Sequence, residues 1–138
     1  MSKKILSSLG LLLLISLLTG ALTAAAPAPN VTFTLVSGLP ATMNVGDTAT
    51  VVVEVTSDQE FNSATMLPDL YFPGRGVVSV QGGDRAGRGN TATLEITFKA
   101  KGSTADLGGA VPVSVVAGVR YPGGNVVVQR YDFNVTVP

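Results

Sequence analysis

The sequence predicts an all-β domain that folds as an antiparallel two-sheet sandwich of about seven strands. Apolar and polar residues alternate along most of the chain after Pro29, as they do in strands with one buried and one solvated face. Gly, Pro, Asn and Asp, which favour turns, interrupt these runs at intervals of roughly 8 to 14 residues, as is typical of all-β domains. A barrel is the alternative architecture.

Three segments show the alternation most clearly: residues 31–35, 49–56 and 93–99. Each places apolar side chains at every second position, with mainly Thr, Glu or Lys between them. We expect three strands whose apolar side chains line the core and whose polar side chains face water.

The C-terminal part of the chain predicts a long hairpin. Residues 111–121 and 126–137 carry apolar side chains at both odd and even positions, and residues 121–125 between them supply the Pro, Gly and Asn of a hairpin turn. Strands that are apolar on both faces are typical of sheet interiors. We therefore expect this hairpin at the heart of one sheet.

The middle of the domain predicts two shorter strands, over residues 63–72 and 77–81. Pro68 cannot donate a backbone hydrogen bond, so the first of them is expected to be an edge strand or to contain a bulge. The Gly-rich residues 82–90 are expected to form a loop. No segment of the domain shows the capped, 3.6-residue pattern of a regular helix.

The first 25 residues predict a cleavable signal peptide. Two lysines precede an apolar stretch of about 14 residues, and a run of small residues follows it. Cleavage is expected after Ala24 or Ala25, because Pro27 would restrict the backbone beside a cut after Ala26. Residues 26–30 then form a short Pro/Ala leader, and residues 31–138 form the domain. The protein is expected in the cell envelope or secreted, with membrane contact only through the transient signal.

Composition excludes several function classes. The chain contains no His and no Cys, which excludes Ser-His-Asp and Cys-His mechanisms, thiol redox chemistry and metal sites built from these residues. Loss of Lys3 and Lys4 with the signal leaves two more acidic than basic residues, whereas nucleic-acid binding needs a strongly basic surface. We expect neither an enzyme nor a nucleic-acid partner.

One segment carries a family resemblance. Residues 39–55, LPATMNVGDTATVVVEV, combine a turn, a Gly-Asp-Thr sequence and an alternating valine strand. This segment resembles the opening of bacterial immunoglobulin-like and cohesin-like sandwich modules. The resemblance implies an immunoglobulin-like fold and an adhesive, scaffolding or spacer role. Those modules usually occur in tandem, and this chain holds one.

Acidic side chains are the remaining candidates for catalysis or metal binding. A glycosidase would need two carboxylates in one cleft, from among Asp58, Glu60, Asp69 and Asp84. Asp58, Glu60 and Asp69, together with Asp47, could also supply oxygen ligands to Ca²⁺. However, no DxDxDG-like run fixes a loop around an ion. We expect these residues to serve turns and surfaces and the protein to need no cofactor, with Ca²⁺ as the alternative.

Two Gly-rich loops, residues 73–76 and 82–90, concentrate three of the seven basic residues outside the signal. If they meet at one end of the sandwich, they form a small cationic patch for anionic glycans or protein carboxylates. Tyr71 and Phe72 have opposite parity, so one ring is expected to point outward beside this patch. The candidate partner-binding residues are Tyr71, Phe72, Arg75, Arg85 and Arg88.

These features predict an exported, non-catalytic interaction or structural domain that binds a protein or a surface polymer. A carbohydrate-binding module with an aromatic platform at Tyr71 or Phe72 is one alternative. A subunit of an extracellular filament is another, in which residues 26–37 complete the sheet of a neighbouring copy. Self-association would distinguish the filament from a monomeric binder.

Overall fold

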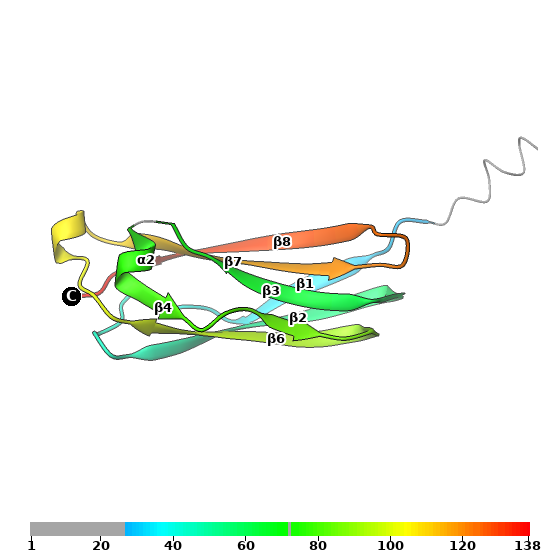
Figure 1. Cartoon of the computed structure of the whole chain (residues 1–138), viewed down its shortest axis with the longest axis horizontal. Coiled ribbons are helices and arrows are strands. Elements are labelled where there is room, and N and C mark those ends of the chain that lie inside the picture. The colour runs from blue at the N-terminus through cyan, green and yellow to red at the C-terminus, as the bar shows by residue number, and fades with distance from the viewer. Residues whose placement is uncertain (1–26, 72) are drawn as a thin grey trace, which may run out of the picture.

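The computed structural model describes residues 27–71 and 73–138, and these form two antiparallel four-stranded sheets packed face to face (Figure 1). The first, the β2–β6 sheet, has the strand order β1-β2-β6-β4, and the second, the β3–β7 sheet, has the order β5-β3-β7-β8. The predicted two-sheet antiparallel sandwich is confirmed, with eight strands. Their bounds are β1 Val31–Ser37, β2 Thr48–Phe61, β3 Ser63–Asp69, β4 Val78–Val80, β5 Asp84–Ala86, β6 Gly89–Ala100, β7 Val111–Arg120 and β8 Val126–Val135.

The strand order is that of an immunoglobulin-like sandwich. Such domains place strands A, B, E and D in one sheet and C, F and G in the other. Here β1, β2, β6 and β4 occupy the first set of positions, and β3, β7 and β8 the second. The additional strand β5 lies beside β3. The immunoglobulin-like fold expected from the resemblance is therefore present.

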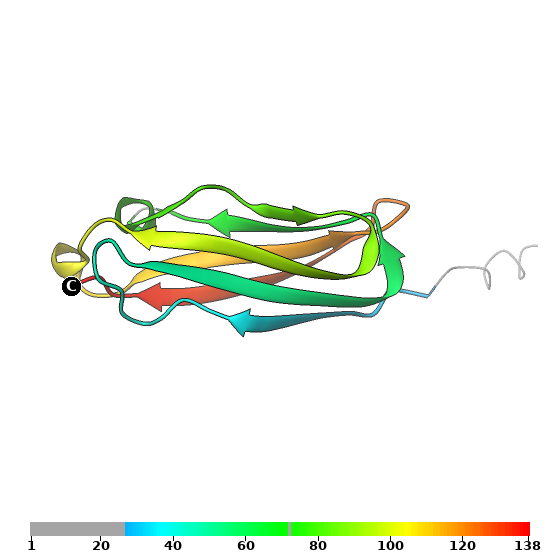
Figure 2. The ribbon, with the colours of Figure 1, turned by 90° about the horizontal axis from the view of Figure 1, so that it is seen from below.

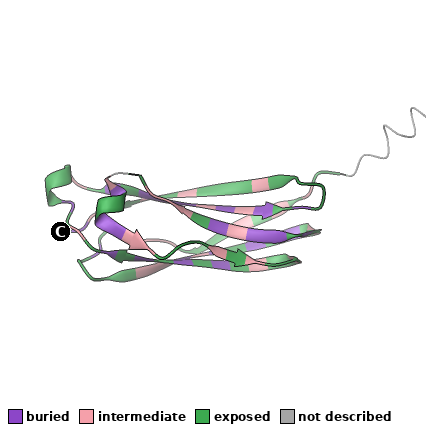
Figure 3. Ribbon diagram, in the orientation of Figure 1, coloured by how far each residue is buried: buried purple, intermediate pink, exposed green. Residues whose placement is uncertain are grey.

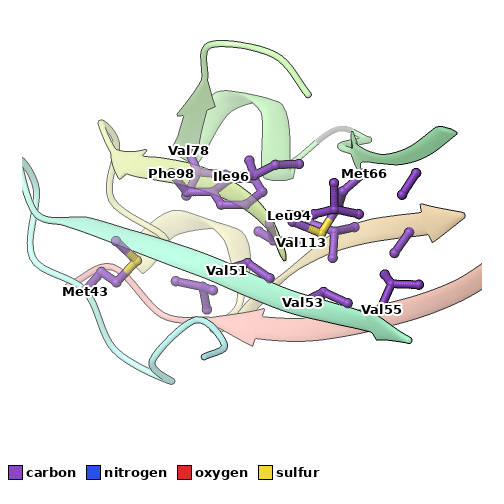
Figure 4. Packing of buried hydrophobic residues seen from close by; sticks show 14 of the residues in the cluster. Met43, Val51, Val53, Val55, Met66, Val78, Leu94, Ile96, Phe98 and Val113 are labelled. Atoms are coloured by element: carbon purple, nitrogen blue, oxygen red, sulfur yellow. The ribbon is translucent and has the colours of Figure 1, made fainter. Parts of the chain in front are cut away.

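The core lies between the two sheets and follows the alternation in the sequence. On β2, Val51, Val53 and Val55 point inward, and on β6 Leu94, Ile96 and Phe98 do the same, so that both rows face the inner side of the β3–β7 sheet (Figure 4). The residues between them point outward, and the Thr50 and Thr97 hydroxyls lie 2.8 Å apart on the outer face. Burial of β-branched and aromatic side chains on one face of each strand is what stabilises a sandwich without disulfides.

One edge of the sandwich is a strand that changes sheets. The chain runs beside β6 as β4, crosses at residues 81–83 and continues beside β3 as β5 (Figure 2). Gly83 permits the crossing, because a β-carbon there would lie 2.5 Å from the Met66 carbonyl oxygen. Asp84 Oδ2 accepts the Glu95 N–H at 2.8 Å, on the stretch of β6 that β4 has left. The predicted strand at residues 77–81 is thus shorter than expected, and residues 84–86 and 89–92, expected as loop or connection, are strand.

The C-terminal hairpin is present, but the expected place of its second strand was wrong. β7 lies between β3 and β8 and is central, whereas β8 is the edge of the β3–β7 sheet. Most of β8 is exposed (Figure 3). Thr136, just beyond it, pairs with residues 41–43 through two backbone hydrogen bonds, which continue the sheet for one step.

Pro68 has the edge position that its chemistry requires. It pairs with Val115 of β7 on one side, while the pairing of β3 with β5 on the other side ends at Met66. Two single helical turns, α2 (Gly74–Val77) and η1 (Ala105–Leu107), connect strands, and neither has the length of a regular helix. Within the described residues no helix is long and apolar enough to cross a membrane.

The predicted signal, residues 1–25, lies outside the described residues. The leader that follows it is attached to the domain at two points: Gln59 Nε2 donates to the Pro27 carbonyl oxygen at 3.0 Å, and the Asn30 N–H donates to Asp58 Oδ1 at 2.8 Å. β1 then pairs with β2 of its own chain over its whole length, with one register shift. Residues 31–37 are therefore already part of a sheet.

Candidate interaction face on the β3–β7 sheet

The predicted arginine patch does not form, because the two Gly-rich loops lie at opposite ends of β3. Arg75 is on α2, which follows the C-terminal end of β3. Arg88 is in the turn between β5 and β6, and β5 pairs with the N-terminal half of β3 (Figure 1). Arg88 Nε lies 3.2 Å from Glu60 Oε1, and both side chains are exposed. Arg85 is on β5 and points to the outer face, because its neighbour Ala86 packs against the core.

Tyr71 has the outward orientation that parity predicted for one of the two aromatic residues. Its side chain is 70% exposed, and Phe72 lies outside the described residues. Next to Tyr71 in the chain, Leu70 lines a polar hollow of about 450 Å³ that also includes Asp69, Arg75 and Lys101. Of the predicted binding residues, the structure brings Arg75 to this hollow and leaves Arg85 and Arg88 elsewhere.

Asp47, Asp58 and Asp84, three of the acidic candidates, accept hydrogen bonds from different backbone N–H groups. Asp47 Oδ2 accepts the Asn44 N–H within a turn, Asp58 accepts Asn30, and Asp84 bridges Arg85 and Glu95 backbone N–H groups. Within the described part of the chain, no three acidic side chains gather as a metal site would require. The turn and surface roles expected for these residues fit these contacts.

The outer face of the β3–β7 sheet carries an apolar patch. This patch was not predicted, because the hairpin was expected to lie at the heart of the sheet. Leu67 of β3 is 55% exposed, and Val126 and Val128 of β8 are 52% and 61% exposed. Half-buried Val116 of β7 pairs with Leu67 on one side and with Arg130 of β8 on the other, so Val128 is its diagonal neighbour. We call Leu67, Val116, Val126 and Val128 the apolar patch.

Gly118 leaves room for the Val128 side chain in the middle of the patch. The glycine pairs with Thr65 on one side and Val128 on the other. A β-carbon there would come within 3.0 Å of Val128 Cγ1, so a larger residue would displace the valine.

The opposite outer face, on the β2–β6 sheet, is polar by comparison. Its outward positions on β2 and β6 are mainly threonine, with Glu54, Glu95 and Lys99 among them. Val36, which is 55% exposed, lies at the register shift of the edge strand β1. The apolar patch therefore distinguishes one face of the sandwich from the other.

A charged network borders the patch on the side of α2. Asp69 of β3, Ser114 of β7 and Asp132 of β8 form one row across the sheet. Arg130 is bound to both carboxylates: its Nε lies 2.8 Å from Asp132 Oδ1, and its Nη1 contacts Asp69 Oδ2. Ser114 Oγ donates to Asp132 Oδ1 beneath this surface. The network fixes the side chains at this end of the face.

The pH dependence of stability should report the Asp132 contacts. The hydrogen bond from Ser114, and then that from Arg130, hold the pKa of Asp132 below its usual value, against a smaller opposing effect of desolvation. A depressed pKa in the folded state contributes stability that is present above the unfolded-state value of about 3.9 and is lost as the pH falls through the folded value. The urea midpoint of the wild type should therefore fall below about pH 4 more steeply than that of Asp132→Asn, whose amide oxygen can still accept both bonds.

Urea unfolding curves for both proteins between pH 2 and pH 7 measure this difference. Equal slopes below pH 4 would show that the Ser114 and Arg130 contacts with Asp132 do not form in solution.

The sequence does contain a signal for the patch, in the run Val126-Val127-Val128. Two of these three valines must point away from the core of an edge strand. The remaining patch residues, Leu67 and Val116, come together only through the pairing of β3 with β7, which local sequence does not reveal.

Comparison with known proteins gives structural likeness alone. No family model matches the chain, and no curated protein matches it. The part of native α2-macroglobulin from Escherichia coli that runs from domain MG7 to the C-terminus matches with 17% identity and a TM-score of 0.45, over 82% of this chain and 17% of that one. Murine CRIg matches with 12% identity and a TM-score of 0.34, over 81% of this chain and 99% of that one.

AvmM, described as catalysing macrocyclization in alchivemycin A biosynthesis, matches with 12% identity and a TM-score of 0.44, over 78% of this chain and 88% of that one. The chain thus spans about a sixth of the α2-macroglobulin chain and most of the other two. The assignment to an immunoglobulin-like sandwich rests on the strand order.

Proposed function

We propose that the protein is an exported, non-catalytic interaction domain that binds a partner protein through the outer face of its β3–β7 sheet. The observation that carries the proposal is the apolar patch. Exposed apolar side chains on monomeric proteins are usually scattered singly, whereas grouped ones with a polar rim are typical of interaction sites. Leu67, Val126 and Val128 share one outer face of the sheet with Val116.

The surroundings of the patch support protein binding. Apolar residues at the centre with charged residues around them are the usual anatomy of a protein interface. Here Asp69 and Asp132 lie beyond Leu67 at one end of the patch, Arg130 pairs with Val116, and Arg120 pairs with Val126 at the other end. The Arg130 side chain is held by two carboxylates, so it loses less conformational freedom when a partner binds.

The chemistry of the chain supports a non-catalytic role. Without His or Cys, acid–base catalysis would fall to carboxylates, and these serve turns and edges or, in the case of Asp69 and Asp132, are both bound to Arg130. Export is inferred from the predicted signal peptide at residues 1–25. An adhesive or scaffolding role of the cohesin-like kind is compatible with this reading.

Photo-crosslinking in cells that produce the full chain tests the proposal. A photoreactive amino acid at Val128 should crosslink to a protein, and the same amino acid at Thr93, an exposed outward position on β6, should not. Mass spectrometry of the product identifies the partner, whether another protein or a second copy. Equal crosslinking from both positions, or none from Val128, would refute the proposed face.

Glycan binding is the second candidate, and one observation favours it. Tyr71 is exposed and directly follows Leu70, which lines the hollow that contains Arg75 and Lys101, so an aromatic ring and two cationic donors for an anionic sugar belong to one region of the chain surface. Binding of acidic polysaccharides should then be lost in Tyr71→Ala and kept in Val128→Asp. The reverse result would assign the binding to the apolar patch instead.

The filament alternative requires a rearrangement. For residues 31–37 to complete the sheet of a neighbour, β1 would have to leave its pairing with β2. The attachment of residues 27–30 to Gln59 and Asp58 would be lost as well. Association through the outer face of the β3–β7 sheet needs neither change.

A further inference from the structure

We propose that two copies of the chain pair antiparallel through their β8 strands, about a twofold axis beside Tyr131, so that their two β3–β7 sheets join into one. The proposal goes beyond the proposed function, because it concerns the edge of the sheet and leaves the apolar patch on the outer face available to a partner. It is drawn from the free backbone groups of β8 and from the order of its charged side chains.

β8 is an edge strand that lacks the usual protection against pairing with another chain. Native sheets protect their edges with short strands, bulges or prolines. The edge strands β4 and β5 have three residues each, and β1 has a register shift after Leu35. β8 has ten residues, no proline and no shift in its pairing with β7. It can therefore accept a further strand along most of its length.

The even-numbered residues of β8 present the free backbone groups. In the hairpin, the Tyr121 N–H donates to the Asn125 carbonyl oxygen at 2.8 Å, and hydrogen-bonded pairs then alternate, so the odd-numbered residues bond to β7. Thr136 follows the same alternation, because its N–H and carbonyl bond to residues 41 and 43 on the other side. The N–H and C=O groups of residues 126, 128, 130, 132 and 134 thus point away from β7.

In the described part of the chain, no strand pairs with this free row. β8 ends the strand order of its sheet, and residues 41–43 bond to the chain beyond it, at Thr136. The Arg130 carbonyl oxygen accepts a hydrogen bond from the side-chain Nε2 of Gln129 at 3.0 Å instead. An added strand would replace such a bond with a backbone ladder.

Charge selects the register in which two β8 strands can meet. Outward residues of one copy must face outward residues of the other, so an axis near the middle of the row lies beside one of residues 129–132. An axis at Arg130 or Asp132 would set like charges opposite each other, and an axis at Gln129 would set both charged residues opposite valines. With the axis at Tyr131, Arg130 of each copy faces Asp132 of the other.

The other side chains fit this register. Val128 faces Asn134 of the second copy, so this valine is not set against a charge. The two Tyr131 rings are adjacent across the axis, on the inner side of the sheet, where aromatic pairs stabilise neighbouring strands. Because Thr136 is already bonded, the ladder spans residues 128–134 of each copy and contains about eight backbone hydrogen bonds.

The length of the ladder sets the strength of the association. Interfaces below about 1,200 Å² in total are typical of transient complexes, and a ladder of about seven residues is of that class. We therefore expect a reversible dimer whose fraction rises with protein concentration. The axis is perpendicular to the sheet, so both apolar patches lie on one side of the dimer and can engage a partner together.

Disulfide trapping tests the proposal, with protein purified from cells that make the full chain. The chain contains no cysteine, so single-cysteine variants can be linked only between copies. Val128→Cys and Asn134→Cys, both at exposed positions, should link at least tenfold faster when mixed in oxidised glutathione than either does alone. In the mixture the two positions face each other with about 5.5 Å between Cα atoms, whereas two copies of position 128 lie about 20 Å apart.

Val126→Cys mixed with Asn134→Cys is the matched control, because Val126 is also exposed but lies two residues out of register. It should link no faster than the single variants, and circular dichroism melts confirm that each variant folds. Equal rates for the two mixtures, or no gain on mixing Val128→Cys with Asn134→Cys, would overturn the proposal. So would a wild type that sediments as a monomer at every concentration up to about 1 mM. The proposed function stands apart from these results, since photo-crosslinking of Val128 to a different protein reports the outer face.

Discussion

Replacing Phe98 by Ala is expected to lower the free energy of unfolding by about 3 to 5 kcal/mol. Phe98 is fully buried on β6, between the two sheets, and is among the largest side chains in the core (Figure 4). Truncation removes the transfer free energy of the ring and leaves a cavity that two hydrogen-bonded sheets cannot close. Since domains of this size are stable by about 5 to 15 kcal/mol, this loss is a large fraction of the total stability.

Urea unfolding followed by circular dichroism measures this loss. Thr93→Ala, at an outward position on the same strand, is the control and should change the free energy of unfolding by no more than about 0.5 kcal/mol. Similar losses in the two variants would mean that the inward and outward faces of β6 are not assigned as described.

Gly83→Ala is expected to destabilise the domain by about 1 to 3 kcal/mol. The new methyl group would meet the Met66 carbonyl oxygen at 2.5 Å and Leu67 Cδ2 at 2.7 Å. The leucine can rotate away, but the carbonyl belongs to the backbone of β3, so β3 or the crossing segment must shift. This substitution tests whether residues 78–86 pass from one sheet to the other beside Met66.

Gly87→Ala provides the comparison within the same connection, because a β-carbon there has no neighbour within 4 Å. It should leave the urea midpoint nearly unchanged or raise it slightly, since Ala loses less backbone entropy on folding. If the two substitutions have equal effects, Gly83 does not pack against β3 as described.

The strands that sequence predicted well are those whose two faces differ in environment. On β2, the inward valines alternate with mainly polar outward residues, and on β6 the inward Leu94, Ile96 and Phe98 do the same. The two-residue alternation in the sequence was therefore enough to identify both strands. Residues 84–86 and 89–92 were missed for a physical reason. A short edge strand that changes sheets buries little surface, and its glycines resemble those of a loop.

The C-terminal hairpin shows where the same reasoning fails. Residues 126–128 are all apolar, so the sequence predicts a strand that is buried on both faces. On β8 the second face is instead the exposed apolar patch. Composition cannot distinguish a side chain buried in the domain from one available to a partner, because both are apolar for the same reason.

The candidate site was less predictable than the fold. Parity predicted that one of Tyr71 and Phe72 points outward, and Tyr71 is exposed. The sequence could not show that Arg75 and Arg88 lie at opposite ends of β3, since that depends on the path of the connection between them. The row of Asp69, Ser114 and Asp132 likewise joins residues from three strands.

Carbene footprinting of the apolar side chains, in cells and on the purified protein at high dilution, tests most directly whether the outer face of the β3–β7 sheet is the interaction face. Leu67 and Val128 should be labelled less in cells than in the dilute protein, because a partner covers them. Val36 and Val45, which are exposed elsewhere, should be labelled equally in both. Equal labelling of Leu67 and Val128 in both samples would contradict the assignment of this face.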